Sequence, residues 1–144
     1  MKKILSIFTL LFVANLAIGQ TVIHGSDMID GELKEGYYLL LKVDEKILNS
    51  EWREYLNSYG RISEVEKNRY SLVKFKQQAI SDNELTLQSK INEMGGFTKV
   101  FCIVEGTNSR NFNEEAFDDF LLDFAAGAQY RELIRLAEVD LEEA

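Results

Sequence analysis

The sequence contains no proline and only one cysteine, one histidine and one tryptophan in 144 residues. Without proline, turns depend on glycine, asparagine and aspartate, and Pro-rich linkers or polyproline ligand segments are excluded. The single cysteine, Cys102, excludes an internal disulfide, and its place between Phe101 and Ile103 predicts a small buried side chain. The single histidine, His24, has no second histidine or nearby cysteine. It is therefore a poor zinc ligand or catalytic base and is expected at the surface.

Catalytic motifs are also missing. The chain has no Gly-x-Ser-x-Gly elbow, no HExxH helix and no phosphate-binding P-loop. Asp27, Asp30, Gly31 and Glu32 lack the alternate-residue spacing of an EF-hand, so this group predicts a turn. These absences predict a protein that is not an enzyme and has no cofactor and no bound metal. Because two of the 24 acidic residues could still converge in a cleft, a carboxylate- or metal-dependent hydrolase stays open as a further hypothesis.

The N-terminal residues have the pattern of an export signal. Lys2 and Lys3 form a positive start, residues 4–17 are almost continuously apolar, and small residues follow. The apolar stretch is shorter than the ~20 residues that span a bilayer, which favours a cleaved leader over a retained anchor. We therefore expect residues 1–19 to be a signal peptide and Gln20 to begin an exported protein, periplasmic or secreted, with no membrane segment after cleavage.

Basic residues are scarce relative to acidic ones. The whole chain has a formal net charge of −8, and residues 20–144 have a charge of −10 because both leader charges are lysines. So negative a protein is a poor partner for nucleic acid or anionic membrane surfaces. The mature length suits one domain with one core. Residues 20–144 are therefore predicted to form a single acidic domain, whose part beyond about residue 128 packs separately.

Hydrophobic periodicity predicts an α+β fold. The residues from Tyr37 to Asp44 alternate with a period of two, as in a strand with one apolar face. Apolar side chains from Leu48 to Tyr59 recur at helical spacing, and residues 61–105 have the texture of a four-stranded meander. A helical segment, residues 111–144, ends the chain. We predict an antiparallel sheet of four to six strands with two helices packed on one face, in the order β-α-β-β-β-β-α.

Turn and cap residues refine this outline. Lys67-Asn68 and Gly95-Gly96 predict tight hairpin turns, and Phe97 to Glu105 predicts the most apolar, central strand. Thr21 to His24 is a candidate edge strand. The remaining local predictions are helix caps at Asp44 or Asn49 and at Asn111, a left-handed Gly60 after the first helix, and inward-facing Val73 and Phe75.

The last helix is predicted to bury its aromatic side and to keep its acids in water. At 100° per residue, one side carries Phe117, Phe120, Leu121, Phe124 and Ala128, and the other carries Glu114, Glu115, Asp118, Asp119 and Asp123. Burying each large apolar side chain stabilises the fold by at most roughly 1.5 to 3 kcal/mol, so packing decides the orientation. The i, i+4 carboxylate pairs offer too few of the six or more oxygens that Ca²⁺ takes, which favours a solvated face over a metal site.

Beyond Gly127 the apolar stripe changes sides. A straight helix cannot present both stripes to one flat sheet. The helix therefore bends or breaks near residues 126–128, or its distal half packs on a second surface. The second stripe is a candidate contact for a protein partner or a second copy of the chain, and it consists of Tyr130, Leu133, Ile134, Ala137 and Leu141.

The first helix carries an aromatic stripe with two interpretations. Trp52, Tyr55 and Tyr59 share one side of that helix with Leu48 and Leu56. Core packing is the favoured interpretation. The alternative is an apolar pocket between sheet and helices, which would make the protein a periplasmic carrier of a small apolar ligand.

The sequence resembles a loose group of small exported proteins of Bacteroidota. The resemblance rests on the leader ending in "AIGQ", on the strand-helix unit "YYLLLKVDEKILNSEWREYLNSYG", and on an acidic C-terminal helix that follows a β meander. It implies export but no activity and no site residues, because that group has no assigned activity. The leading hypothesis from sequence is a non-enzymatic exported domain that binds protein or serves a structural role.

Overall fold

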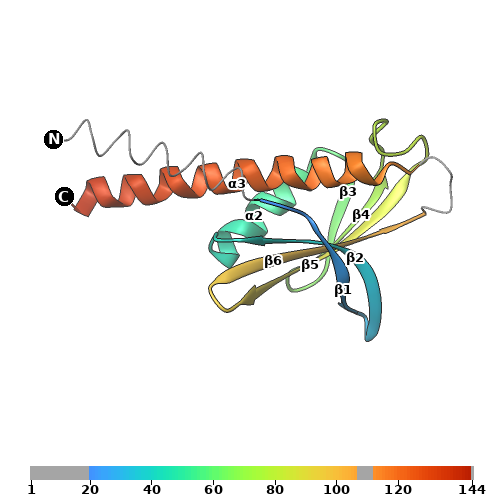
Figure 1. The fold of residues 1–144 in the computed structure, drawn as a ribbon, viewed down its shortest axis with the longest axis horizontal. Helices are drawn as coiled ribbons and strands as arrows, with labels where there is room; N and C mark the ends of the chain where they lie inside the picture. Colours follow the sequence, from blue (N-terminus) through green and yellow to red (C-terminus); the bar gives the residue numbers. More distant parts are fainter. Residues whose placement is uncertain (1–19, 107–111, 144) are drawn as a thin grey trace.

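The computed structural model describes residues 20–106 and 112–143, which form one antiparallel sheet and two helices (Figure 1). The strands are ordered β1-β2-β6-β5-β4-β3 across the sheet. This arrangement confirms the predicted α+β fold class, and β6 lies in the interior of the sheet as its apolar sequence indicates. The expected leader lies outside the described residues. The strands are β1 Ile23–Ile29, β2 Glu32–Leu41, β3 Arg61–Glu66, β4 Arg69–Phe75, β5 Leu85–Met94 and β6 Phe97–Glu105.

Two helices, α2 (Glu45–Asn57) and α3 (Glu114–Glu143), pack on the same face of the sheet. Helix α2 contacts β3, β4 and β5, and α3 contacts β2 and α2. Asp44 caps α2 by accepting hydrogen bonds from the backbone N–H groups of its first turn, as predicted. The Oδ1 atom of Asn113 accepts the backbone N–H of Ala116 at 3.1 Å and so caps α3. The predicted cap of this helix, Asn111, lies outside the described residues.

The hairpin turns follow the predicted turn chemistry. Asp30 and Gly31 have φ values of 53° and 78°, and Gly95 and Gly96 have φ values of 50° and 92°. Two successive positive φ values match the right-handed twist of the flanking strands. The expected turn at Asp30-Gly31 is therefore confirmed. It joins β1 to β2. The candidate edge strand at Thr21 to His24 is found at the edge of the sheet, but it begins at Ile23 and continues to Ile29.

The prediction that Val73 faces the core was wrong. Val73 is 37% exposed, whereas Leu72 and Phe75 are fully buried. The pairing of β4 with β5 shifts between Leu72 and Phe75, where Lys74 has a φ of 57°. This bulge adds a residue to the alternation, so Leu72 rather than Val73 points inward together with Phe75.

Gly60 also differs from its prediction. Helix α2 ends at Asn57, Ser58 keeps a right-handed conformation, and Gly60 does not adopt a positive φ. A Cβ atom at this position would lie 2.7 Å from the carbonyl oxygen of Val73. Glycine is needed there because strand β4 passes close to the backbone, not because the helix ends in a left-handed residue.

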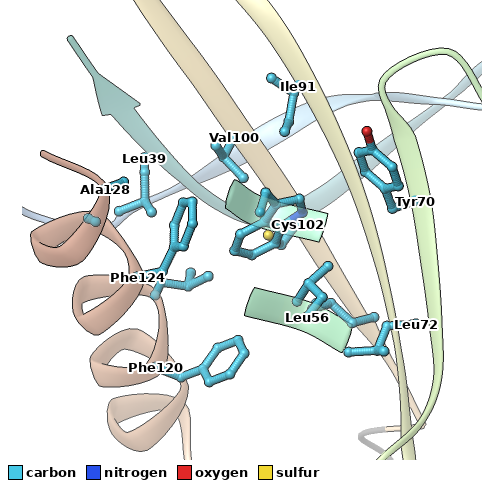
Figure 2. Close-up of a cluster of buried hydrophobic side chains, with 14 of the residues drawn as sticks. Leu39, Leu56, Tyr70, Leu72, Ile91, Val100, Cys102, Phe120, Phe124 and Ala128 are labelled. Carbon is cyan, nitrogen blue, oxygen red and sulfur yellow. The ribbon is translucent and has the colours of Figure 1, made fainter. Parts of the chain in front are cut away.

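The main core lies between the helices and the sheet (Figure 2). Phe120, Phe124 and Ala128 from α3 face Leu39 of β2 and the strands beside it. Cys102 of β6 lies in this core with no solvent exposure, and burial raises the pKa of its thiol. The predicted role of Cys102 as a small buried side chain is confirmed, and so is the inward orientation of the aromatic side of α3.

The β1–β2 hairpin covers part of the opposite face of the sheet. Tyr37 to Leu41 pair with β6, whereas the earlier residues of β2 pair only with β1. The strand leaves β6 at Gly36, where a Cβ atom would lie 2.2 Å from the carbonyl oxygen of Cys102. Beyond this point Ile29 of the hairpin is buried with Phe101 and Ile103 in a second, smaller core. The bend at Gly36 thus determines where the hairpin lies.

An ionic contact also holds the hairpin on this face. Asp27 of β1 accepts the backbone N–H of Met28 at 2.7 Å and lies 3.1 Å from Lys99 Nζ and 3.4 Å from Lys90 Nζ. Burial raises the pKa of the Asp27 carboxyl. The hydrogen bond from Met28 and the two ammonium groups outweigh this effect, and the net result is a lowered pKa. The charged form of Asp27 is therefore favoured in the folded state.

This lowered pKa predicts an acid-dependent contribution to stability. A carboxyl with a lowered folded pKa stabilises the protein above its unfolded pKa of about 4, and this contribution is lost as the pH falls through the folded value. Asp27→Asn is expected to lower the free energy of unfolding by about 1 kcal/mol at pH 7. Near pH 3 the variant and the wild type should be almost equally stable. Urea unfolding at both pH values measures the difference. Asp119→Asn, an exposed matched control, is expected to change stability by less than about 0.5 kcal/mol. A constant deficit of Asp27→Asn at both pH values would contradict the ionic role.

Candidate functional site

Helix α3 continues without a break through Gly127. The distal apolar stripe therefore stays on the side of the helix that its sequence positions give it, away from the buried phenylalanines. Tyr130 is 61% exposed, Ile134 is 42% exposed and Leu141 is 77% exposed. Between the two explanations open from sequence, the structure therefore excludes a break and leaves the distal stripe at the surface.

The distal part of α3 projects beyond the sheet (Figure 1). From Leu133 to Glu142 no described side chain is buried, whereas Ala128 and Glu132 still are. Leu133 is half-buried and Ala137 is exposed. We name the predicted set of Tyr130, Leu133, Ile134, Ala137 and Leu141 the distal stripe. Leu136 and Val139 on the remaining sides of the same segment are also exposed.

Of the predicted aromatic stripe, Trp52 lies in the core, whereas Tyr55 on α2 and Tyr59 just after it are half-buried against the core. Trp52 is fully buried and its Nε1–H donates to Ser89 Oγ at 2.8 Å. The Tyr55 hydroxyl donates to the carbonyl oxygen of Phe120 at 2.7 Å, and burial raises the pKa of this phenol. The rings of Trp52, Tyr55 and Tyr59 contact one another and the phenylalanines of α3 at centroid distances of 4.8 to 6.2 Å. These ring contacts favour core packing over a ligand pocket for the aromatic residues.

A surface cleft lies elsewhere, at the start of α3. Its volume is about 680 Å³, and its walls come from β1, β2, the end of β6 and the first residues of α3. Tyr37 and Phe112 provide apolar surface, whereas Glu35 and Glu114 provide carboxylates. The cleft is therefore mixed in character and acidic.

His24 joins the edge strand β1 to α3 at this cleft. Its Nε2 atom lies 3.1 Å from Asp118 Oδ2, and its Nδ1 atom lies 3.4 Å from Glu114 Oε1. The hydroxyl of Tyr37 donates to Glu114 Oε2 at 2.9 Å. Burial, reinforced by this hydrogen bond, raises the pKa of the Tyr37 phenol. Glu114 and Asp118 thus bind the neighbouring strands in addition to facing water, whereas Glu115, Asp119 and Asp123 are exposed.

The geometry of His24 limits its chemistry. Each ring nitrogen faces a carboxylate, and the imidazolium form can donate to both at once. Both ring nitrogens are thus in contact with α3. In the described parts of the chain, no group of three or more His, Cys, Asp or Glu side chains is arranged to hold a metal ion. The network is better suited to holding β1 against α3.

Sequence reasoning missed this network. Asp118 is 94 positions from His24, and no local pattern connects the two. Only the pairing of β1 with β2 and the placement of α3 over β2 bring the three elements together. The only sequence signal for these residues was the amphipathic pattern of α3, which predicts that its acidic residues lie on the side away from the core.

Comparison with protein-family models, curated proteins and solved structures finds no significant match. Among the described residues, no helix is long and apolar enough to cross a membrane.

Proposed function

We propose that this protein is an exported, non-enzymatic domain that binds another protein through the distal stripe of α3. The observation that carries the proposal is the exposure of Tyr130, Ile134 and Leu141 on a helical segment that projects past the sheet. Apolar side chains at helical spacing on one side of a helix are the usual anchors of helix-mediated binding. The six-stranded sheet and proximal α3 would then serve as the base that presents this segment.

The energetics of the distal segment support this proposal. Exposed apolar area costs roughly 25 cal/mol per Å² relative to burial, and a contiguous apolar surface on a soluble protein commonly marks an interaction site. The proximal half of α3 is already anchored by buried Phe117, Phe120 and Phe124. The fold therefore does not need the distal stripe for its own core. A partner that covers the stripe would recover the hydrophobic free energy that the monomer leaves unused.

Export is the part of the proposal that rests on sequence. The positively charged start, the short apolar stretch and the small residues before Gln20 support a cleaved signal. The negative charge of the remaining chain favours protein partners over nucleic acid and anionic membranes. The two ring nitrogens of His24 lie against Glu114 and Asp118, and this contact between β1 and α3 supports a structural role for the only histidine.

The alternative of an apolar-ligand carrier has less support. Trp52 is buried, Tyr55 and Tyr59 are half-buried against the core, and the rings pack on neighbouring aromatic rings outside the described cleft. The cleft near Tyr37 has the carboxylates of Glu35 and Glu114 in its wall. A small apolar ligand there would have to desolvate these charges, which is costly.

Site-specific photo-cross-linking tests the proposed function. A photoreactive phenylalanine analogue replaces Ile134 in the full chain, produced with its own leader in an exporting bacterium. We expect a light-dependent protein adduct that disappears when Leu141→Asp is added, because a buried carboxylate would oppose docking. The same analogue at Glu115, an exposed position on proximal α3, is the matched control. If position 134 forms no adduct, or only the adducts that position 115 also forms, the proposed function is wrong.

A further inference from the structure

We propose that the distal stripe binds a second copy of the same chain, with the two α3 helices antiparallel. This inference rests on the proposed function and specifies its partner. It is derived from three properties of the distal segment: the side-chain sizes along the stripe, the distribution of charge along the helix, and the free length of helix beyond the sheet.

The stripe is self-complementary when it is read in opposite directions. Tyr130, Ile134, Ala137 and Leu141 are spaced four, three and four residues apart, which is the spacing of a helix-helix seam. In an antiparallel pair, Tyr130 of one copy lies beside Leu141 of the other, and Ile134 lies beside the small Ala137. Each large side chain then faces a smaller or flexible one. A parallel pair would instead place tyrosine on tyrosine and alanine on alanine.

Charge along the distal segment also favours the antiparallel direction. The start of the segment has a net charge of +1 from Arg131, Arg135 and Glu132, and Arg135 is paired with Glu132 at 2.6 Å. Its end carries Glu138, Asp140 and Glu142 and no basic residue. Antiparallel pairing brings each positive end beside the negative end of the other copy. Parallel pairing would instead bring the two acidic ends together, which opposes association.

One specific pair follows from the helical geometry. Arg131 and Glu138 are seven residues apart and so flank the same side of the stripe two turns from each other. In the antiparallel arrangement Arg131 of one copy faces Glu138 of the second copy, and symmetry repeats this contact. Arg131 already bonds Glu51 through Nε at 2.6 Å, yet its side chain is half exposed. The guanidinium therefore keeps N–H donors for a second carboxylate.

The free length of α3 leaves room for the second copy. The seam from Tyr130 to Leu141 is roughly 16 Å long at 1.5 Å per residue. The sheet lies at the other end of α3 (Figure 1), so antiparallel pairing places the two sheets at opposite ends of the seam. Because so short a seam buries less than the ~800 Å² per partner of a standard interface, the dissociation constant should be roughly 10 µM to 1 mM.

Charge reversal with mixing tests both the partner and the direction. Two variants of the mature chain (residues 20–144), Arg131→Glu and Glu138→Arg, are purified separately. Their self-association is measured by sedimentation equilibrium. Each variant alone places two like-charged pairs in the antiparallel dimer and should associate about tenfold more weakly than the wild type. An equimolar mixture restores two attractive pairs and should recover to within about threefold of the wild type. Trp52 emission during urea unfolding verifies that each variant is folded.

A cysteine pair gives an independent measurement if Arg131→Glu does not fold. Tyr130→Cys and Leu141→Cys chains are mixed under mild oxidation. Both positions are exposed, whereas native Cys102 is buried and does not compete. The antiparallel arrangement predicts that the mixed disulfide exceeds either same-site disulfide by about tenfold, since like positions lie roughly 16 Å apart.

The outcomes distinguish this inference from the proposed function. A wild type that stays monomeric up to about 1 mM overturns the second-copy inference, as does a predominance of same-site disulfides or a mixture that fails to recover. In the first case the proposed function still stands if Ile134 cross-links to a different protein. The proposed function and the second-copy inference both fail only if the photoreactive residue at position 134 forms no specific adduct.

Discussion

Replacing Gly36 by alanine is expected to destabilise the fold by about 3 kcal/mol or more, one of the largest effects of any single methyl group in this protein. The added Cβ would lie 2.2 Å from the carbonyl oxygen of Cys102, 2.9 Å from Ile103 and 3.0 Å from Phe101. None of these atoms can move freely, because β6 is an interior strand and both side chains are buried. The strain would separate the β1–β2 hairpin from β6.

The same chemical change in α3 is the matched control. Gly127→Ala is expected to raise stability by up to ~1 kcal/mol, because alanine is the better helix former. Its nearest contact, Arg131 at 3.2 Å, is the flexible end of a side chain. Urea unfolding monitored by circular dichroism measures both variants. If Gly36→Ala were as stable as the wild type, the close approach of β2 to β6 would be wrong.

Phe124→Ala is expected to cost about 3 to 5 kcal/mol. Phe124 is almost fully buried, and its ring contacts Trp52 edge-on at 4.8 Å and Tyr55 at 5.2 Å. Its removal would leave a cavity at the junction of α2 and α3, where both rings lose a partner. With a total stability of roughly 5 to 15 kcal/mol for a domain of this size, the variant would be partly or completely unfolded at moderate temperature.

Thermal and urea unfolding measure this loss. Trp52 is the only tryptophan, so its emission reports on the affected junction, and circular dichroism reports on the whole fold. Phe97→Ala is the control, since Phe97 is 39% exposed at the start of β6 and its replacement should cost less than about 1 kcal/mol. Equal losses in the two variants would mean that the proximal part of α3 is not the anchor.

The local predictions succeeded where a short-range pattern decides the outcome. The period of 3.6 residues placed Phe117, Phe120 and Phe124 in the core, and the apolar sequence of residues 97–105 located β6. Turn chemistry located Gly95-Gly96, because only positive φ values fit that hairpin. A single inserted residue was enough to defeat this reasoning at Val73, since the bulge at Lys74 reverses the alternation.

The candidate sites depended more heavily on tertiary structure. The aromatic stripe of α2 was consistent with either a core or a pocket, and only the arrival of Phe120 and Phe124 from α3 showed that its rings pack in the core. His24 had no partner that sequence could identify. Its contacts with Glu114 and Asp118 depend on three elements that are distant in the chain.

The sequence by itself determined that α3 has two apolar faces, because side-chain direction along a helix follows from position alone. Which face is buried was decided only by the tertiary structure. A helix that continues through Gly127 presents faces roughly 150° apart, whereas the sheet lies on one side only and ends before the helix does. The proximal phenylalanines therefore became core, and the distal stripe stayed at the surface as the segment from which we propose an interaction.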